Sequence, residues 1–220
     1  MNKARRIVLN LFLGVATCLF LVGLAATPSL SNSGSGFSNL RSVQPTSNLD
    51  GFPQQIAANL QDATAASMTQ AQGMSDQDVS NTSITRYVAV LTKNGVVAAQ
   101  PSTSGFGSAG AVLVGDQLIV RGDYSNLSSA LRDYETDPLD PPNPNITSGI
   151  HIHQGEPTAN GPFQYALEVS PAPSQLAGRF NGAYTLTTEQ AQALSEGKLY
   201  VDIHTKQNRA GELRGIFQPY

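Results

Sequence analysis

Apolar and histidine side chains alternate along Gly149-Ile150-His151-Ile152-His153-Gln154-Gly155. Successive side chains of a β-strand point to opposite faces, so His151 and His153 share one face and the two isoleucines share the other. This stretch therefore predicts a strand with one apolar face and one face that carries two imidazoles.

A second stretch, Leu199-Tyr200-Val201-Asp202-Ile203-His204-Thr205, repeats the alternation. Its polar face carries Tyr200, Asp202 and His204. If the two strands are neighbours, three imidazoles converge on one point, which is a geometry that binds metal ions. A lone strand histidine is more often solvated or hydrogen-bonded, but all three histidines of the chain fall in these two stretches. The pattern favours a metal site.

Many short strands with regular turn signals predict an all-β fold for residues 84–220. Asn94-Gly95 and Gly115-Asp116 are typical hairpin turns, and residues 96–99 are expected to return along the strand that begins at Ile84. The expected architecture is a Greek-key β-sandwich, immunoglobulin-like or superoxide-dismutase-like, with one short helix.

That short helix is expected at residues 187–194. Thr187 and Gln190 have the spacing of a capping box, in which each side chain bonds to the backbone of the other residue. Gly197 follows the segment and can end the helix, because glycine adopts the left-handed conformation common at helix ends.

The N-terminus has the pattern of an export signal. Lys3, Arg5 and Arg6 precede an apolar run that reaches Ala26, so residues 1–26 are predicted to be a signal peptide. An uncleaved anchor is the alternative and is the only membrane contact we expect. The single cysteine, Cys18, lies in this run, so cleavage leaves a chain without disulfides or thiolate ligands.

Composition excludes one class of partner and indicates a spacer. The 13 basic and 16 acidic residues give a net charge of −3 without a basic stripe, so no nucleic acid is expected. Residues 27–83 are rich in small and polar side chains, which favours a flexible low-complexity spacer. The alternative for part of it is a short helix over residues 53–72.

Residues 84–220 resemble a known family, the CHRD domain, named from chordin and common in exported bacterial proteins. The resemblance lies in the two histidine strands, in the capped helix that follows Leu186, and in the segments Asn160-Gly161-Pro162 and Asn208-Arg209-Ala210-Gly211-Glu212-Leu213-Arg214-Gly215. It implies an all-β module that is periplasmic, attached to the cell envelope or extracellular. The family implies no settled biochemical activity.

The histidine strands are also, more distantly, similar to the copper site of copper/zinc superoxide dismutases. That resemblance implies copper on His151, His153 and His204, with zinc as the alternative metal, and a role for Arg214 in guiding an anionic substrate. The chain has no histidine left for a metal-bridging ligand or for a zinc site of that type, and no disulfide. Whether the protein is an enzyme is left open.

Three further residues are expected around the histidines. Asp202 is expected to orient an imidazole without binding the metal, and Tyr200 and Glu212 are expected to line the same region. The alternatives are that Tyr200 only covers a sheet face and that Glu212 and Arg214 form a cross-strand ion pair of little energetic value.

Three functions follow from these features. The first is an exported protein with a three-histidine copper or zinc site, and the second is a superoxide dismutase-like oxidoreductase. The third is a non-catalytic interaction or adhesion module of the cell envelope with structural histidines. A metal ion is the expected ligand, and a cell-envelope or extracellular protein is a further candidate partner. Catalytic-triad, phosphate-loop and cofactor-fingerprint motifs are not recognisable in the sequence.

Overall fold

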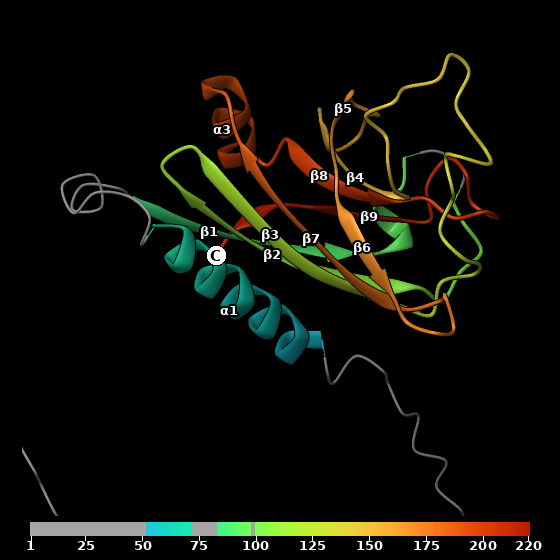
Figure 1. The fold of residues 1–220 in the computed structure, drawn as a ribbon, viewed down its shortest axis with the longest axis horizontal. Coiled ribbons are helices and arrows are strands. Elements are labelled where there is room, and N and C mark those ends of the chain that lie inside the picture. Colours follow the sequence, from blue (N-terminus) through green and yellow to red (C-terminus); the bar gives the residue numbers. More distant parts are fainter. Residues whose placement is uncertain (1–51, 72–82, 98–99) are drawn as a thin grey trace, which may run out of the picture. The chain divides into compact units, whose positions relative to one another are not determined.

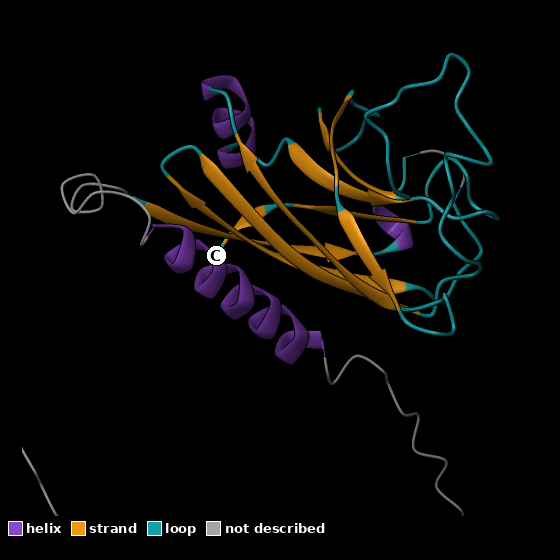
Figure 2. Cartoon of the chain, in the orientation of Figure 1, coloured by secondary structure: helices purple, strands orange, loops and turns teal. Residues whose placement is uncertain are grey.

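The computed structural model of the chain describes residues 52–71, 83–97 and 100–220, and two antiparallel sheets dominate it (Figures 1 and 2). The larger sheet has the strand order β10 (Gln218–Pro219), β1 (Ile84–Leu91), β2 (Phe106–Val114), β3 (Gln117–Ser125), β7 (Gly178–Thr185) and β6 (Glu168–Pro171). The smaller has the order β5 (Phe163–Ala166), β4 (Ile150–Gln154), β8 (Leu199–Ile203) and β9 (Leu213–Ile216). The predicted all-β sandwich is confirmed.

The main core lies between the sheets and uses the predicted apolar faces. Ile150 and Ile152 of β4 are fully buried, as are Leu199, Val201 and Ile203 of β8. Each such side chain contributes about 1.5–3 kcal/mol on burial. Because side chains alternate along a strand, burying these residues turns the histidines of β4 to the outer face of the smaller sheet.

A helix occupies the segment for which a short helix over residues 53–72 was the alternative to a flexible spacer. Helix α1 (Phe52–Ala71) has 20 residues and packs on the outer face of β2 and β3, where Leu60 and Ala63 are buried against Val112 and Ile119. A Cβ at Gly110 would lie 2.5 Å from the backbone nitrogen of Leu60, so the missing side chain admits the helix. Close packing of small residues therefore holds the helix on the sheet, and the composition of the segment alone does not reveal this packing. The predicted signal peptide and the rest of residues 27–83, apart from Ser83, lie outside the described residues.

The return strand expected over residues 96–99 is wrong where the structure describes it: Val96 and Val97 are not in a strand, and residues 98–99 lie outside the described residues. Residues Lys93–Gly95 form one 3-10 turn, η1, and the strand that returns along β1 is β2, which begins at Phe106. The reason is a contact with the other sheet: Thr92 and Arg214 exchange backbone hydrogen bonds of 3.1 and 3.0 Å. A Cβ at Gly95 would lie 2.6 Å from the Arg214 carbonyl oxygen, so this glycine serves a close approach instead of a hairpin.

Two local predictions are confirmed. Gly115 has φ of 62° in the tight turn that joins β2 to β3. Helix α3 (Thr188–Ser195) begins with the capping box of Thr187 and Gln190, and Gly197 follows it with φ of 69°. Among the described residues, no helix is long and apolar enough to cross a membrane.

Candidate metal centre

The three histidines meet on neighbouring strands. Strands β4 and β8 are adjacent and antiparallel, and their register pairs His151 with Asp202 and His153 with Tyr200. His204 follows directly after β8, and one nitrogen from each ring lies within 4.8 Å of the others. The ring centroids of His151 and His204 are 5.0 Å apart. The convergence expected from the two alternating stretches is therefore present.

A backbone carbonyl fixes each ring. A carbonyl oxygen only accepts hydrogen bonds, so the ring nitrogen that faces it carries the proton and the second nitrogen of the neutral ring keeps a lone pair. The bonds join His151 Nε2 to the oxygen of Ser148 (2.5 Å), His153 Nδ1 to that of Gly161 (3.1 Å) and His204 Nδ1 to that of Arg209 (3.0 Å).

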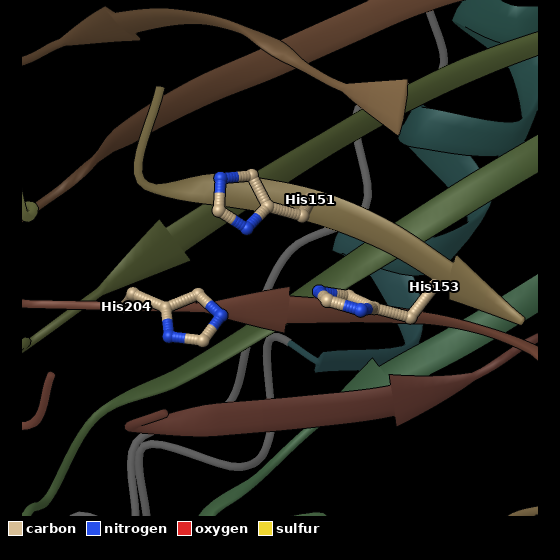
Figure 3. A group of neighbouring side chains, drawn as sticks. All are labelled: His151, His153 and His204. Atoms are coloured by element: carbon tan, nitrogen blue, oxygen red, sulfur yellow. The ribbon is translucent and has the colours of Figure 1, made fainter. Parts of the chain in front are cut away.

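The remaining nitrogens share one space. They are Nδ1 of His151 and Nε2 of His153 and His204, and in Figure 3 one nitrogen of each ring points into the gap between the rings. Among the described residues, Nε2 of His153 and of His204 are buried without a hydrogen-bond partner. A buried unsatisfied group costs about 1–3 kcal/mol, and a metal ion removes that cost by accepting the lone pair. The donor set fits a metal ion.

The rings are held in the neutral form that binds metals. Burial, helped by the nearby His204, lowers the pKa of His151 to about 3. Burial also lowers the pKa of His153 and His204, and in both cases the negative charge of Asp202 opposes this effect. Near neutral pH all three imidazoles are therefore unprotonated ligands, and a carboxylate lies close enough to stabilise a positive charge.

Asp202 acts on the histidines through its charge and makes no hydrogen bond to them. Its two oxygens accept bonds of 2.7 and 2.6 Å from Nε and Nη2 of Arg214. This differs from the expectation that Asp202 orients an imidazole directly, and it also replaces the alternative pairing of Arg214 with Glu212.

Arg214 faces the protein and not the solvent. Its side chain is 3% exposed, and its remaining bonds go to the Ala159 carbonyl oxygen (3.1 Å) and to Oδ1 of Asn160 (2.8 Å). A guanidinium with these partners holds the 159–160 loop and Asp202 in place. The arrangement does not support the expected role in guiding an anion.

Tyr200 contacts the site as expected. Its ring stacks on His153, with centroids 5.5 Å apart and an interplanar angle of 7°, and the Arg214 guanidinium carbon lies 4.1 Å from the same ring. The Tyr200 hydroxyl accepts a 2.6 Å bond from the Gly161 N–H, and the Gly161 carbonyl in turn accepts from His153. Tyr200 therefore positions His153 twice, by stacking and through Gly161.

Glu212 joins loops beside the site. It is fully buried, and its neutral donors are Thr103 Oγ1 (2.5 Å), Ser128 N (2.7 Å), Ser128 Oγ (2.6 Å), Thr205 Oγ1 (2.6 Å) and Asn208 Nδ2 (3.1 Å). Burial alone would raise the pKa of Glu212, but these bonds hold it below its usual value. Since Thr205 follows His204, Glu212 fixes the chain behind a ligand and makes no hydrogen bond to the rings.

Two aromatic residues at the site were missed. The rings of Tyr134 and Phe163 each lie 5.4 Å from that of His151, and Phe163 also faces His153 edge-on. Phe163 lies opposite His153 in the pairing of β5 with β4, so only the strand register places it there. Tyr134 belongs to an irregular loop, which carries no periodic signal.

Comparison with known proteins supports the family. No curated protein and no solved structure matches the chain. The similarity to superoxide dismutases therefore stays a prediction. The CHRD domain matches residues 87–217, which include every strand from β2 to β9 and all three histidines but not α1. Since this match covers more than half of the 220 residues, the chain belongs to the CHRD domain family.

Proposed function

We propose that this CHRD-domain protein is exported and holds one metal ion, copper or alternatively zinc, on His151 Nδ1, His153 Nε2 and His204 Nε2. The observation that carries the proposal is the pair of buried Nε2 atoms without partners in the described chain. A histidine with only a structural role would form hydrogen bonds through both ring nitrogens or expose one of them to water.

The donor set limits the metal and its chemistry. Three neutral imidazoles suit Cu²⁺ and Zn²⁺, and a fourth position remains for water or another ligand. An ion there would satisfy the open nitrogens while the three carbonyl bonds keep the rings in place. Asp202 supplies a negative charge nearby without occupying a ligand position.

Binding is favoured over dismutation. A dismutase needs a positive group at the entrance, and the residue expected in that role, Arg214, is buried against Asp202. We therefore propose a metal-binding module and treat redox turnover as an outcome to be measured once a metal is bound.

Export rests on the sequence of residues 1–26 and on the family, since that segment lies outside the described residues. A cell-envelope or extracellular protein remains a proposed partner. N-terminal sequencing of the protein recovered from the cell envelope and medium tests export. A new N-terminus after residue 25 or a few residues later supports it, whereas recovery only from the cytoplasm with Met1 retained contradicts it.

Elemental analysis tests the metal site. The full chain, carrying no polyhistidine tag, is incubated with Cu²⁺ or Zn²⁺ and dialysed. We expect one ion per chain, lost in His153→Ala and in His204→Ala. Gln154→Ala, on the same strand as two ligands, should keep the ion. Circular dichroism establishes that each variant is folded, and a wild-type chain that retains no metal would reject the proposal.

A further inference from the structure

A polar groove lies on the larger sheet, on the side away from the smaller one. It runs between α1 and strands β3, β7 and β6 and has a volume of about 500 Å³. Its lining includes two arginines and four other polar side chains, which are Asn59, Asp62, Arg121, Ser170, Arg179 and Asn181. None of these residues belongs to the candidate metal centre.

Helix α1 forms one wall of the groove and is fixed there. The Asn59 side-chain N–H groups bond to Ser108 Oγ (2.9 Å) and to Asp123 Oδ2 (2.8 Å), which ties the helix to β2 and β3. Asn59 and Asp62 are three residues apart and therefore lie on one side of the helix. Because α1 lies outside the match to the CHRD domain, the family domain alone does not form this groove.

Strand register forms the floor. Arg121 of β3 lies opposite Asn181 of β7, and Arg179 of β7 lies opposite both Asp123 of β3 and Ser170 of β6. Phe180, between the two β7 residues, is buried in the core, so its neighbours point outward. The register therefore gathers two arginines, a serine and an asparagine on one small area.

The two arginines have donors to spare. Within the described chain, the Arg179 side chain makes no hydrogen bond or close ion pair, although its charge acts on Asp123, and the Arg121 side chain bonds only to the carbonyl oxygen of its neighbour Val120 (2.8 Å). Three acidic groups share this face with them: Asp62 on the helix wall, Asp123, whose Oδ2 accepts from Asn59, and the exposed Glu168 of β6, which lies opposite Asn181. Guanidinium groups recognise planar or tetrahedral oxyanions through paired charged hydrogen bonds.

We propose that this groove binds an oxyanion, a carboxylate, sulfate or phosphate group of a polar ligand. Arg121 and Arg179 supply the charged donors, and Ser170 and Asn181 supply neutral ones. The volume suits a small molecule or one residue of a polymer. This site is independent of the proposed metal site, because the two lie on opposite outer faces of the sandwich.

Isothermal titration of the metal-free full chain with citrate, sulfate and inorganic phosphate, at low salt, tests the proposal. We expect saturable binding at one site, and the anion bound most tightly identifies the oxyanion class. Arg179→Gln and Arg121→Gln should each weaken that binding about tenfold, the usual value of a charged hydrogen bond. Asp62→Asn should strengthen it, since it removes a like charge beside the anion.

Arg86→Gln is the matched control, because Arg86 lies on β1 outside the groove. This substitution should change the oxyanion affinity by no more than about twofold, because salt screens a surface charge that lies far from the groove. Thermal unfolding shows that each variant keeps the fold, as expected for the exposed Arg179. Equal weakening by Arg86→Gln, unchanged affinity in Arg179→Gln, or no saturable heat with any of the three anions would overturn the proposal.

Discussion

Arg214 and Asp202 form a buried, two-point ion pair beside the histidines, with bonds of 2.7 and 2.6 Å and side chains only 3% and 5% exposed. The Asp202 charge acts on His153 and His204, while Arg214 lies against Tyr200, which stacks on His153. The pair therefore links β8, which ends directly before His204, to the residues that support His153.

Asp202→Asn should destabilise the fold strongly. The substitution leaves the Arg214 charge buried without its partner, and breaking a buried pair in this way costs about 3–5 kcal/mol. Urea unfolding of the metal-free protein measures the change. Asp62→Asn removes an exposed carboxylate and should change the unfolding free energy by no more than about 0.5 kcal/mol. Equal effects of the two variants would contradict the role of the pair.

Tyr200→Phe should weaken metal binding without removing a ligand. It deletes the hydroxyl that accepts from Gly161, whose carbonyl fixes the His153 ring. Loss of such a support typically lowers metal affinity about tenfold or more. Competition with a chelator of known affinity measures the change.

Tyr165→Phe provides the comparison for Tyr200→Phe. The Tyr165 hydroxyl bonds to Thr185 and Gln190, away from the histidines, so this variant should retain wild-type metal affinity. If both phenylalanine variants bind the metal like the wild type, the hydroxyl of Tyr200 does not position His153.

Glu212→Gln should make stability less sensitive to acid. The pKa of Glu212 is held below its usual value, so the folded state favours the carboxylate. Its contribution is complete above the unfolded pKa of about 4.3 and is lost as pH falls through the lower folded pKa. At pH 7 the variant should lose about 1–3 kcal/mol, since an amide nitrogen cannot accept the bonds that one carboxylate oxygen now accepts.

Unfolding curves between pH 7 and pH 3 test this expectation. The gap between the wild type and Glu212→Gln should narrow towards the acid end. As a control, Glu135→Gln changes an exposed residue whose side chain makes no hydrogen bond or ion pair in the described part of the chain, and it should follow the wild-type curve closely. A gap that stays constant or widens with acid would show that Glu212 does not contribute as a buried carboxylate.

The histidine site was predictable because period-two alternation fixes which side chains share a face. His151 and His153 had to lie together, and their meeting with His204 required only that β4 and β8 be neighbours, which the structure confirms. The partners of Arg214 and Glu212 were not predictable. The pattern of a strand does not say whether its polar face is covered, and here two loops cover it, through Tyr134 and through residues 159–161.

Helix α1 was predicted only as an alternative to a flexible spacer, and its packing on the sheet was not predicted. Its contact with the sheet uses Leu60, Ala63 and the bare backbone of Gly110, so close packing of small residues replaces the large apolar side chains that a sequence pattern reveals. Composition reports how much apolar surface a segment has, but it does not report how closely a sheet lets that segment approach.

Gly110→Ala should release α1 from the sheet. The new Cβ would lie 2.5 Å from the Leu60 nitrogen and 2.6 Å from its Cα, and both are backbone atoms that cannot turn aside. Overpacking of this kind costs about 1–3 kcal/mol, and we expect this cost to weaken the contact between α1 and the sheet. Hydrogen exchange should show faster exchange of the α1 amides, while the amides of β4 and β8 keep their protection. Gln61→Ala, on the exposed side of α1, should leave exchange unchanged.

Since α1 forms a wall of the polar groove, Gly110→Ala should also weaken oxyanion binding while metal retention persists. Unchanged α1 exchange would mean that Gly110 does not set the approach of the helix, and loss of protection throughout both sheets would mean that α1 is not a separable layer of the fold.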